Sequence, residues 1–179
     1  MTAAAATNAA SKRKVAALAF WSIVVALVVT WLKYVAWWMT GSVALYSDAL
    51  ESIVNVITSL AAFWAIRVSH MPADRDHPFG RHKAEYFSAV LEGVLIVVAA
   101  LLIIAQVWQS LRVPVPLQQP WEGLAINGAA AVVNAVWATI LIRSGRTEKS
   151  PALVADGKHI MTDVITSAGV IAGLVGAVL

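Results

Sequence analysis

Two short polar patterns interrupt long apolar stretches of this sequence, where polar residues are costly. Glu51 and Asn55 are four residues apart in one stretch, and His159 and Asp163 are four residues apart in another. A spacing of four places each pair on one face of a helix. Two carboxylates, one amide oxygen and one imidazole nitrogen are suitable ligands for a divalent cation. These residues therefore predict a metal site with four ligands.

The stretches that carry these residues are long enough to cross a lipid bilayer. The sequence is 60% hydrophobic and only 13% charged, and its mean hydropathy is +0.75. A transmembrane helix needs about 20 apolar residues. We therefore predict an all-α, polytopic transmembrane helix bundle over residues 15–179, after a polar tail over residues 1–14. The expected spans are Val15–Met39, Ser42–Val68, Ala84–Leu111, Trp121–Arg143 and Pro151–Leu179.

Lysine and arginine residues gather on one side of this predicted topology. Three lie in the N-terminal tail, and others lie in the second and fourth connections, whereas the first connection has none and the third has one. Basic residues favour cytoplasmic segments of membrane proteins. We therefore expect a multi-pass membrane protein with a cytoplasmic N-terminus. The expected location is the bacterial cytoplasmic (inner) membrane. The basic pI of about 9.5 follows from this bias and does not indicate a nucleic-acid partner.

The two polar pairs are expected at matching depths in the membrane. Asn55 lies 13 residues from Val68, and Asp163 lies 13 residues from Ser150, at the cytoplasmic ends of their spans, which corresponds to ~20 Å at the helical rise. Matched depth favours one shared site near mid-membrane. The alternative is that these residues act as polar contacts between helices, as polar residues in membranes often do.

Three other charged residues have less specific interpretations. Asp48 is either an outer relay for ions or a hydrogen-bonded partner of a neighbouring helix. Lys33 lies six residues from the end of its span, so it is expected to extend toward the interface. Glu92 is expected to pair with another helix, although it would also suit the border of the cytoplasmic entrance.

Several chemistries are excluded by what the sequence lacks. The absence of cysteine excludes disulfides and thiolate metal sites. The sequence lacks the H-E-x-x-H pattern that an intramembrane metalloprotease would need. It also lacks the G-x-x-x-x-G-K-[ST] pattern that would indicate direct use of ATP. We therefore expect no enzymatic activity and no organic cofactor.

Three motifs make the sequence similar to one family of transporters. They are GSVALYSDALESIVNV over residues 41–56, DRDHPFGRHKAE over residues 74–85 and VADGKHIMTDV over residues 154–164. Together they resemble the cation diffusion facilitator (cation efflux) family. The resemblance implies exchange of a divalent metal ion for protons, usually with export of the metal from the cytoplasm. It places the transport-site ligands at Glu51, Asn55, His159 and Asp163.

The resemblance also bears on the identity of the metal and on a second site. The family commonly has Asp or His and then Asp where this sequence has Glu51 and Asn55. Because oxygen-rich sites favour harder ions, the transported metal is expected to be manganese, iron or zinc. Asp74 and His77 match a peripheral metal site of some members, although a further ligand position holds Arg81. The alternative is an ordinary solvated loop.

Family members typically have six membrane helices and a soluble cytoplasmic domain, and five spans are predicted here. The resemblance therefore implies a truncated chain without the sixth helix and that domain, and a homodimer for the full-length form. The expected mechanism is alternating access, with His159 as the candidate for proton coupling because imidazole titrates near neutrality. The alternatives are a transporter or channel for another cation, and a membrane scaffold fragment that transports nothing.

Overall fold

Five α-helices account for nearly all of the structure, a computed structural model that describes residues 3–75, 77–110 and 120–178. The helices are α1 (Ala3–Thr40), α2 (Val43–Ser69), α3 (Lys83–Ser110), α4 (Pro120–Thr147) and α5 (Pro151–Val178). Each contains a segment long and apolar enough to cross a membrane, and the described residues include no strand. The predicted all-α, polytopic class is confirmed. Most of the third predicted connection, including Pro114 and Pro116, lies outside the described residues.

The first helix extends further toward the N-terminus than the predicted span. α1 begins at Ala3, so the segment predicted as a polar tail is largely helical. Four consecutive alanines open it, and alanine has the highest helix propensity. The apolar part that is suited to a membrane begins at Ala10.

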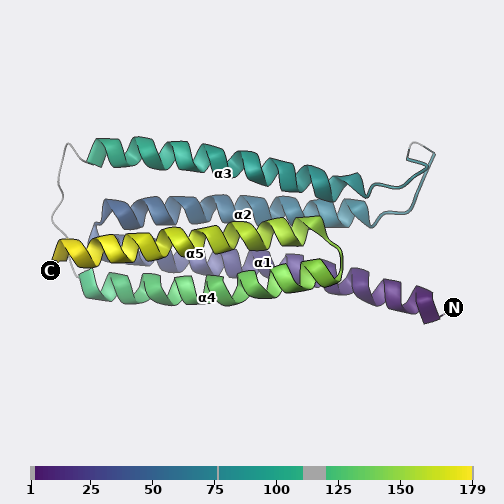
Figure 1. Cartoon of the computed structure of the whole chain (residues 1–179), viewed down its shortest axis with the longest axis horizontal. Coiled ribbons are helices and arrows are strands. Elements are labelled where there is room, and N and C mark those ends of the chain that lie inside the picture. The colour runs from purple at the N-terminus through teal and green to yellow at the C-terminus, as the bar shows by residue number, and fades with distance from the viewer. Residues whose placement is uncertain (1–2, 76, 111–119, 179) are drawn as a thin grey trace.

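The helices run alternately up and down, as Figure 1 shows. α1, α2, α4 and α5 pack together, and α3 lies at the edge of the bundle, where it contacts α2 and α5. The N-terminus, the α2–α3 loop and the α4–α5 connection lie at one end, and the C-terminus lies at the other. The three segments rich in lysine and arginine are therefore on the same side of the bundle.

Small residues allow α4 and α5 to approach closely. A Cβ atom at Gly157 would lie 2.8 Å from Cγ1 of Ile142, and one at Gly145 would lie 2.9 Å from Cγ2 of Val154. Both distances are shorter than real Cβ contacts, so these positions need glycine. Close packing of this kind is typical of membrane helices. With one face of α5 packed on α4, a neighbouring face carries its acidic residues toward α1 and α2.

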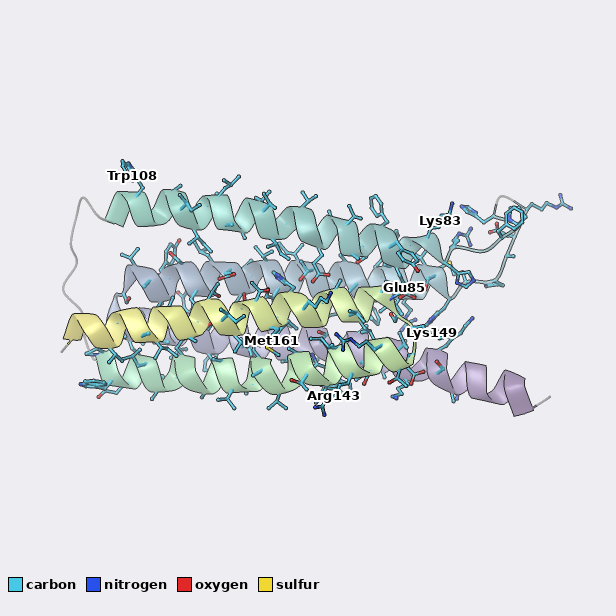
Figure 2. The ribbon with its side chains drawn as sticks, in the orientation of Figure 1. Lys83, Glu85, Trp108, Arg143, Lys149 and Met161 are labelled. Carbon is cyan, nitrogen blue, oxygen red and sulfur yellow. The ribbon has the colours of Figure 1, made fainter. Side chains whose placement is uncertain are left out.

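Polar contacts close both ends of the bundle. At one end, Gly41 takes a φ of +64°, and the hydroxyl of Ser42 then accepts the N–H of Leu45 to begin α2. At the other end, Glu85 accepts hydrogen bonds from the hydroxyls of Ser69 and Ser150. Glu85, labelled in Figure 2 beside the α4–α5 connection, thus links three segments and holds the register of α2 against α5.

Candidate metal site in the helix bundle

Asp163 lies within a cluster of buried polar side chains from three helices. Its side chain is fully buried, and its Oδ2 accepts a hydrogen bond from Nδ2 of Asn55 at 2.5 Å. Met161, two residues earlier, is labelled in the central part of the bundle in Figure 2. One residue of the α2 pair, Asn55, therefore contacts one residue of the α5 pair, Asp163, across the α2–α5 interface.

Lys33 of α1 completes the charged part of this cluster. Its Nζ lies 2.7 Å from Oδ1 of Asp48 and 3.3 Å from Oδ2 of Asp163, and its side chain is 0% exposed. The prediction that Lys33 extends toward the interface is wrong. A buried ammonium needs anionic partners, and the bundle interior supplies two.

The reason for the inward position of Lys33 is the periodicity of α1. Its buried residues recur every three or four positions, as expected for one helical face, and the series is Ser22, Ala26, Val29, Lys33, Ala36 and Thr40. Closeness to the helix end mattered less than membership of this face.

Asp48 is held by contacts with two other helices. In addition to Lys33 on α1, the hydroxyl of Ser167 on α5 lies 2.9 Å from Oδ1 and 3.1 Å from Oδ2 of Asp48. These contacts favour the interpretation of Asp48 as a hydrogen-bonded partner of neighbouring helices. Ser167 was not singled out from the sequence, although it lies four residues after Asp163 and therefore on the same face of α5.

Several atoms of the predicted ligands have no hydrogen-bond partner among the described residues. They are Oδ1 of Asn55, Oδ1 of Asp163 and both ring nitrogens of His159, which is 3% exposed. Leaving a buried polar atom unpaired typically costs ~1–3 kcal/mol. The two oxygens and one nitrogen of a neutral imidazole have lone pairs available for a cation. Three of the four predicted ligands are thus buried and have an atom with a lone pair that no hydrogen bond uses.

Glu51 lies at the edge of this arrangement. It is partly exposed, accepts a hydrogen bond from Thr166 of α5 at 3.2 Å, and lines a cavity of about 220 Å³ between α2 and α3. No three His, Asp or Glu side chains among the described residues form a group compact enough to hold a metal ion. The structure therefore gathers the four predicted ligands at the α2–α5 interface without closing them around one point.

Glu92 of α3 does not pair with another helix. Both of its carboxylate oxygens are buried and lack a hydrogen-bond partner among the described residues, so the expected pairing is wrong. α3 packs mainly against α2 and α5, and at least one nearby hydroxyl on α2 is already used by another carboxylate. Ser59 of α2, for example, donates to Asp156 of α5 at 3.1 Å.

The loop between α2 and α3 holds its polar residues in a different way. Nη2 of Arg81 lies 2.6 Å from Oδ2 of Asp74 and 3.1 Å from Nδ1 of His77, and the backbone N–H of His77 donates to Oδ1 of Asp74 at 2.8 Å. The hydrogen bond from Arg81, followed by that from the His77 backbone, lowers the pKa of Asp74 below its usual value. An internal cation already holds both residues, which favours the solvated-loop interpretation over a peripheral metal site.

Comparison with known proteins agrees with the motifs. Residues 19–179 match the model of the cation efflux transmembrane domain. An uncharacterized transporter of Synechocystis sp. is 50% identical over 150 residues, which cover 84% of this chain and 48% of the relative. The cation-efflux pump FieF of Yersinia enterocolitica is 33% identical over 162 residues, which cover 90% of this chain and 54% of the relative.

The chain thus spans about half the length of the curated relatives that it matches. The family match is to a transmembrane domain and includes the part of α1 from Ala19 onward and the other four helices. The chain belongs to the cation efflux family.

Proposed function

We propose that this chain forms the membrane pathway of a transporter that exports a divalent metal cation from the cytoplasm. The observation that carries the proposal is that Asn55, His159 and Asp163 each have a possible metal-ligand atom without a hydrogen-bond partner among the described residues. They belong to two helices that contact each other, and all three residues are buried. Polar atoms without partners in a membrane interior indicate a pathway or a site rather than helix packing alone.

The donor set indicates the kind of metal. Glu51 and Asp163 supply carboxylates, Asn55 an amide oxygen and His159 an imidazole. Three oxygen ligands and one nitrogen ligand favour manganese or iron, and the set also suits zinc. A small movement of Glu51 toward α5 would complete the site, and Thr166 already holds its carboxylate beside that helix.

We propose that metal export is coupled to proton import. A metal ligand must be deprotonated to bind, so loading the site releases protons. The motifs and the family relationship support antiport. The same relationship supports a homodimer in the bacterial inner membrane for the full-length form.

The orientation that we propose places the N-terminus and the α2–α3 loop in the cytoplasm, because the basic segments share one end of the bundle. The chain has no cysteine, so single cysteines can be introduced without a background signal. An impermeant thiol reagent should label Pro116→Cys from outside intact cells and should label Phe79→Cys only after permeabilisation. The reverse pattern would contradict the direction of export.

Transport itself is testable with proteoliposomes that contain the full-length protein. Asp163→Ala should abolish uptake of Mn²⁺ or Zn²⁺, because the cation would lose a charged ligand in a layer of low dielectric constant. Asn55→Asp should retain binding and change the preference among metals. Uptake that persists in Asp163→Ala would refute the proposed function.

A further inference from the structure

We infer that Lys33 is a tethered cation that competes with the transported metal for Asp163 and moves wholly to Asp48 when the metal binds. The inference rests on the proposed function, because it assumes that Asp163 is a metal ligand. It assigns a specific role to a residue that supplies no ligand atom.

The contacts of Lys33 are unequal in length. Its Nζ lies 2.7 Å from Asp48 but 3.3 Å from Asp163. Asp48 is the fixed partner, because Ser167 also contacts both of its carboxylate oxygens. Asp163 is the partner that Lys33 shares, because its Oδ2 also accepts the hydrogen bond from Asn55.

A metal ion on the free Oδ1 of Asp163 and the ammonium group near its Oδ2 would share one carboxylate. Metal–carboxylate bonds are about 2.0–2.2 Å long in a zinc site, and two cations on one carboxylate would repel each other strongly in a membrane interior. Lys33 can move without a change in α1, because four flexible methylenes carry its ammonium group. Because Nζ of Lys33 already contacts Asp48, the ammonium group can stay paired with Asp48 when it moves away from Asp163.

The charges of the cluster agree with this exchange. When ionised, Asp48, Glu51 and Asp163 together carry three negative charges and Lys33 carries one positive charge, so a bound divalent cation makes the cluster neutral. Without Lys33 the empty cluster would carry three negative charges, which is more costly in the bilayer than the net negative charge of two that remains with Lys33. Before loading, the ammonium partly neutralises Asp163. Lys33 thus stabilises the free state of Asp163 and weakens its apparent affinity for metal.

Competition predicts that loss of Asp48 lowers the metal affinity and that additional loss of Lys33 raises it again. We would titrate Mn²⁺ into the chain in lipid nanodiscs and measure affinity by calorimetry. Asp48→Asn leaves Asp163 as the only carboxylate partner of Lys33, so Mn²⁺ affinity should fall. The double variant Lys33→Met/Asp48→Asn removes the competitor, and its affinity should exceed that of Asp48→Asn by about tenfold, within the coupling found for residues in contact.

A matched control separates competition from a general effect of charge. Asp156→Asn also removes a buried carboxylate of the bundle, but Asp156 does not contact Lys33. Its Mn²⁺ affinity should stay within about threefold of the unmodified chain, because changes at distant sites are largely independent. If Asp156→Asn weakens binding as much as Asp48→Asn does, or if the double variant binds no better than Asp48→Asn, the role of Lys33 is refuted.

Two further results keep the outcomes distinct. Asp163→Asn should abolish Mn²⁺ binding; if it does not, the proposed function fails, and the role of Lys33 fails with it. If the double variant does not fold, a structure of the unmodified chain with Mn²⁺ bound decides. Nζ of Lys33 should then lie beyond the ~4 Å limit of an ion pair from Asp163 and within it from Asp48. An unchanged contact with Asp163 would overturn the inference.

Discussion

Asp163 and Asp156 are the same residue type on the same helix, two turns apart, and both are fully buried, yet their surroundings differ. Each oxygen of Asp156 has one donor, from Ser22 on α1 and from Ser59 on α2. In contrast, Oδ2 of Asp163 has two partners while its Oδ1 has none. Neutral hydroxyls satisfy Asp156, whereas Asp163 faces a cation and retains a free oxygen. The Asp156 carboxylate joins helices through both of its oxygens, whereas the Asp163 carboxylate joins them through one oxygen only.

The same difference extends to the neighbours of each aspartate. We call the group formed by Asp156 and its hydrogen-bonded neighbours the Asp156 layer. In it, the hydroxyl of Ser22 also accepts the indole N–H of Trp137 on α4 at 3.2 Å, so α1, α2 and α4 are all linked to α5 there. The Asp163 layer continues to His159, whose ring nitrogens have no partner among the described residues. Polar groups in a membrane bundle thus serve packing where they are saturated and can serve transport where they are not.

The largest expected effect is a difference in metal binding between variants of the two aspartates. Asp163→Asn should weaken metal binding at least about 100-fold, since removal of one partner from a buried ionic contact costs ~3–5 kcal/mol. Asp156→Asn should leave binding nearly unchanged and lower thermal stability. Calorimetric titration of Mn²⁺ and a melting curve on each variant in nanodiscs measure both effects. Equal loss of binding in the two variants would show that the layers share one function.

The second prediction concerns the donors to Asp156. Replacement of Ser22 and Ser59 by alanine should leave that carboxylate buried without partners, and each lost donor should cost about 1–3 kcal/mol of stability. The melting temperature should fall, with the double variant below either single one. Thr30→Ala is a suitable control, because Thr30 donates only to the backbone oxygen of Ser52. Metal affinity that falls together with stability would contradict the separation of the two layers.

The sequence predicted that Asn55 and Asp163 lie at one level of the bundle better than it predicted the contacts around them. The helical rise alone placed Asn55 and Asp163 at one level, and they are in contact, because membrane helices of similar tilt keep depth in register with residue number. The position of Glu51 at the edge of the cluster, beside a cavity between α2 and α3, and the lack of a partner for Glu92 among the described residues depend on how neighbouring helices pack. Lys33 was misjudged because its distance from the helix end was weighed above its helical face.

Glu92 offers a third, smaller test of the comparison. Its two unpaired oxygens resemble the free oxygen of Asp163, but no predicted ligand contacts it. Glu92→Gln removes an acid that is costly to bury without partners, so the melting temperature should rise or stay constant. Metal affinity should remain within about twofold, as for changes outside functional sites. Loss of transport with unchanged folding would instead place Glu92 on the metal pathway.

The smallest effect is expected in the α2–α3 loop, where Arg81 already supplies the cation that Asp74 and His77 would otherwise need. Replacement of both Asp74 and His77 by alanine should leave metal transport within about twofold, because surface substitutions normally have small effects. Arg81→Ala serves as the complementary variant, since it removes the internal cation and leaves the two candidate ligands free. A marked change of metal dependence in the first variant would support a peripheral metal site.

Acid should loosen the same loop in a defined direction. Because the pKa of Asp74 is lower in the folded loop than its usual value, ionised Asp74 stabilises the loop above its unfolded pKa, near 3.9. That stabilisation is lost as the pH falls through the lower, folded pKa. Hydrogen exchange at the backbone N–H of His77, which donates to Asp74, should therefore remain slow relative to a free peptide from neutral pH down to about pH 4 and lose its protection only below that value. Asp74→Asn should remove the pH dependence. Protection that is lost near pH 6 would instead assign the loop order to a histidine, since imidazole titrates there, and would reopen the role of His77 as a ligand.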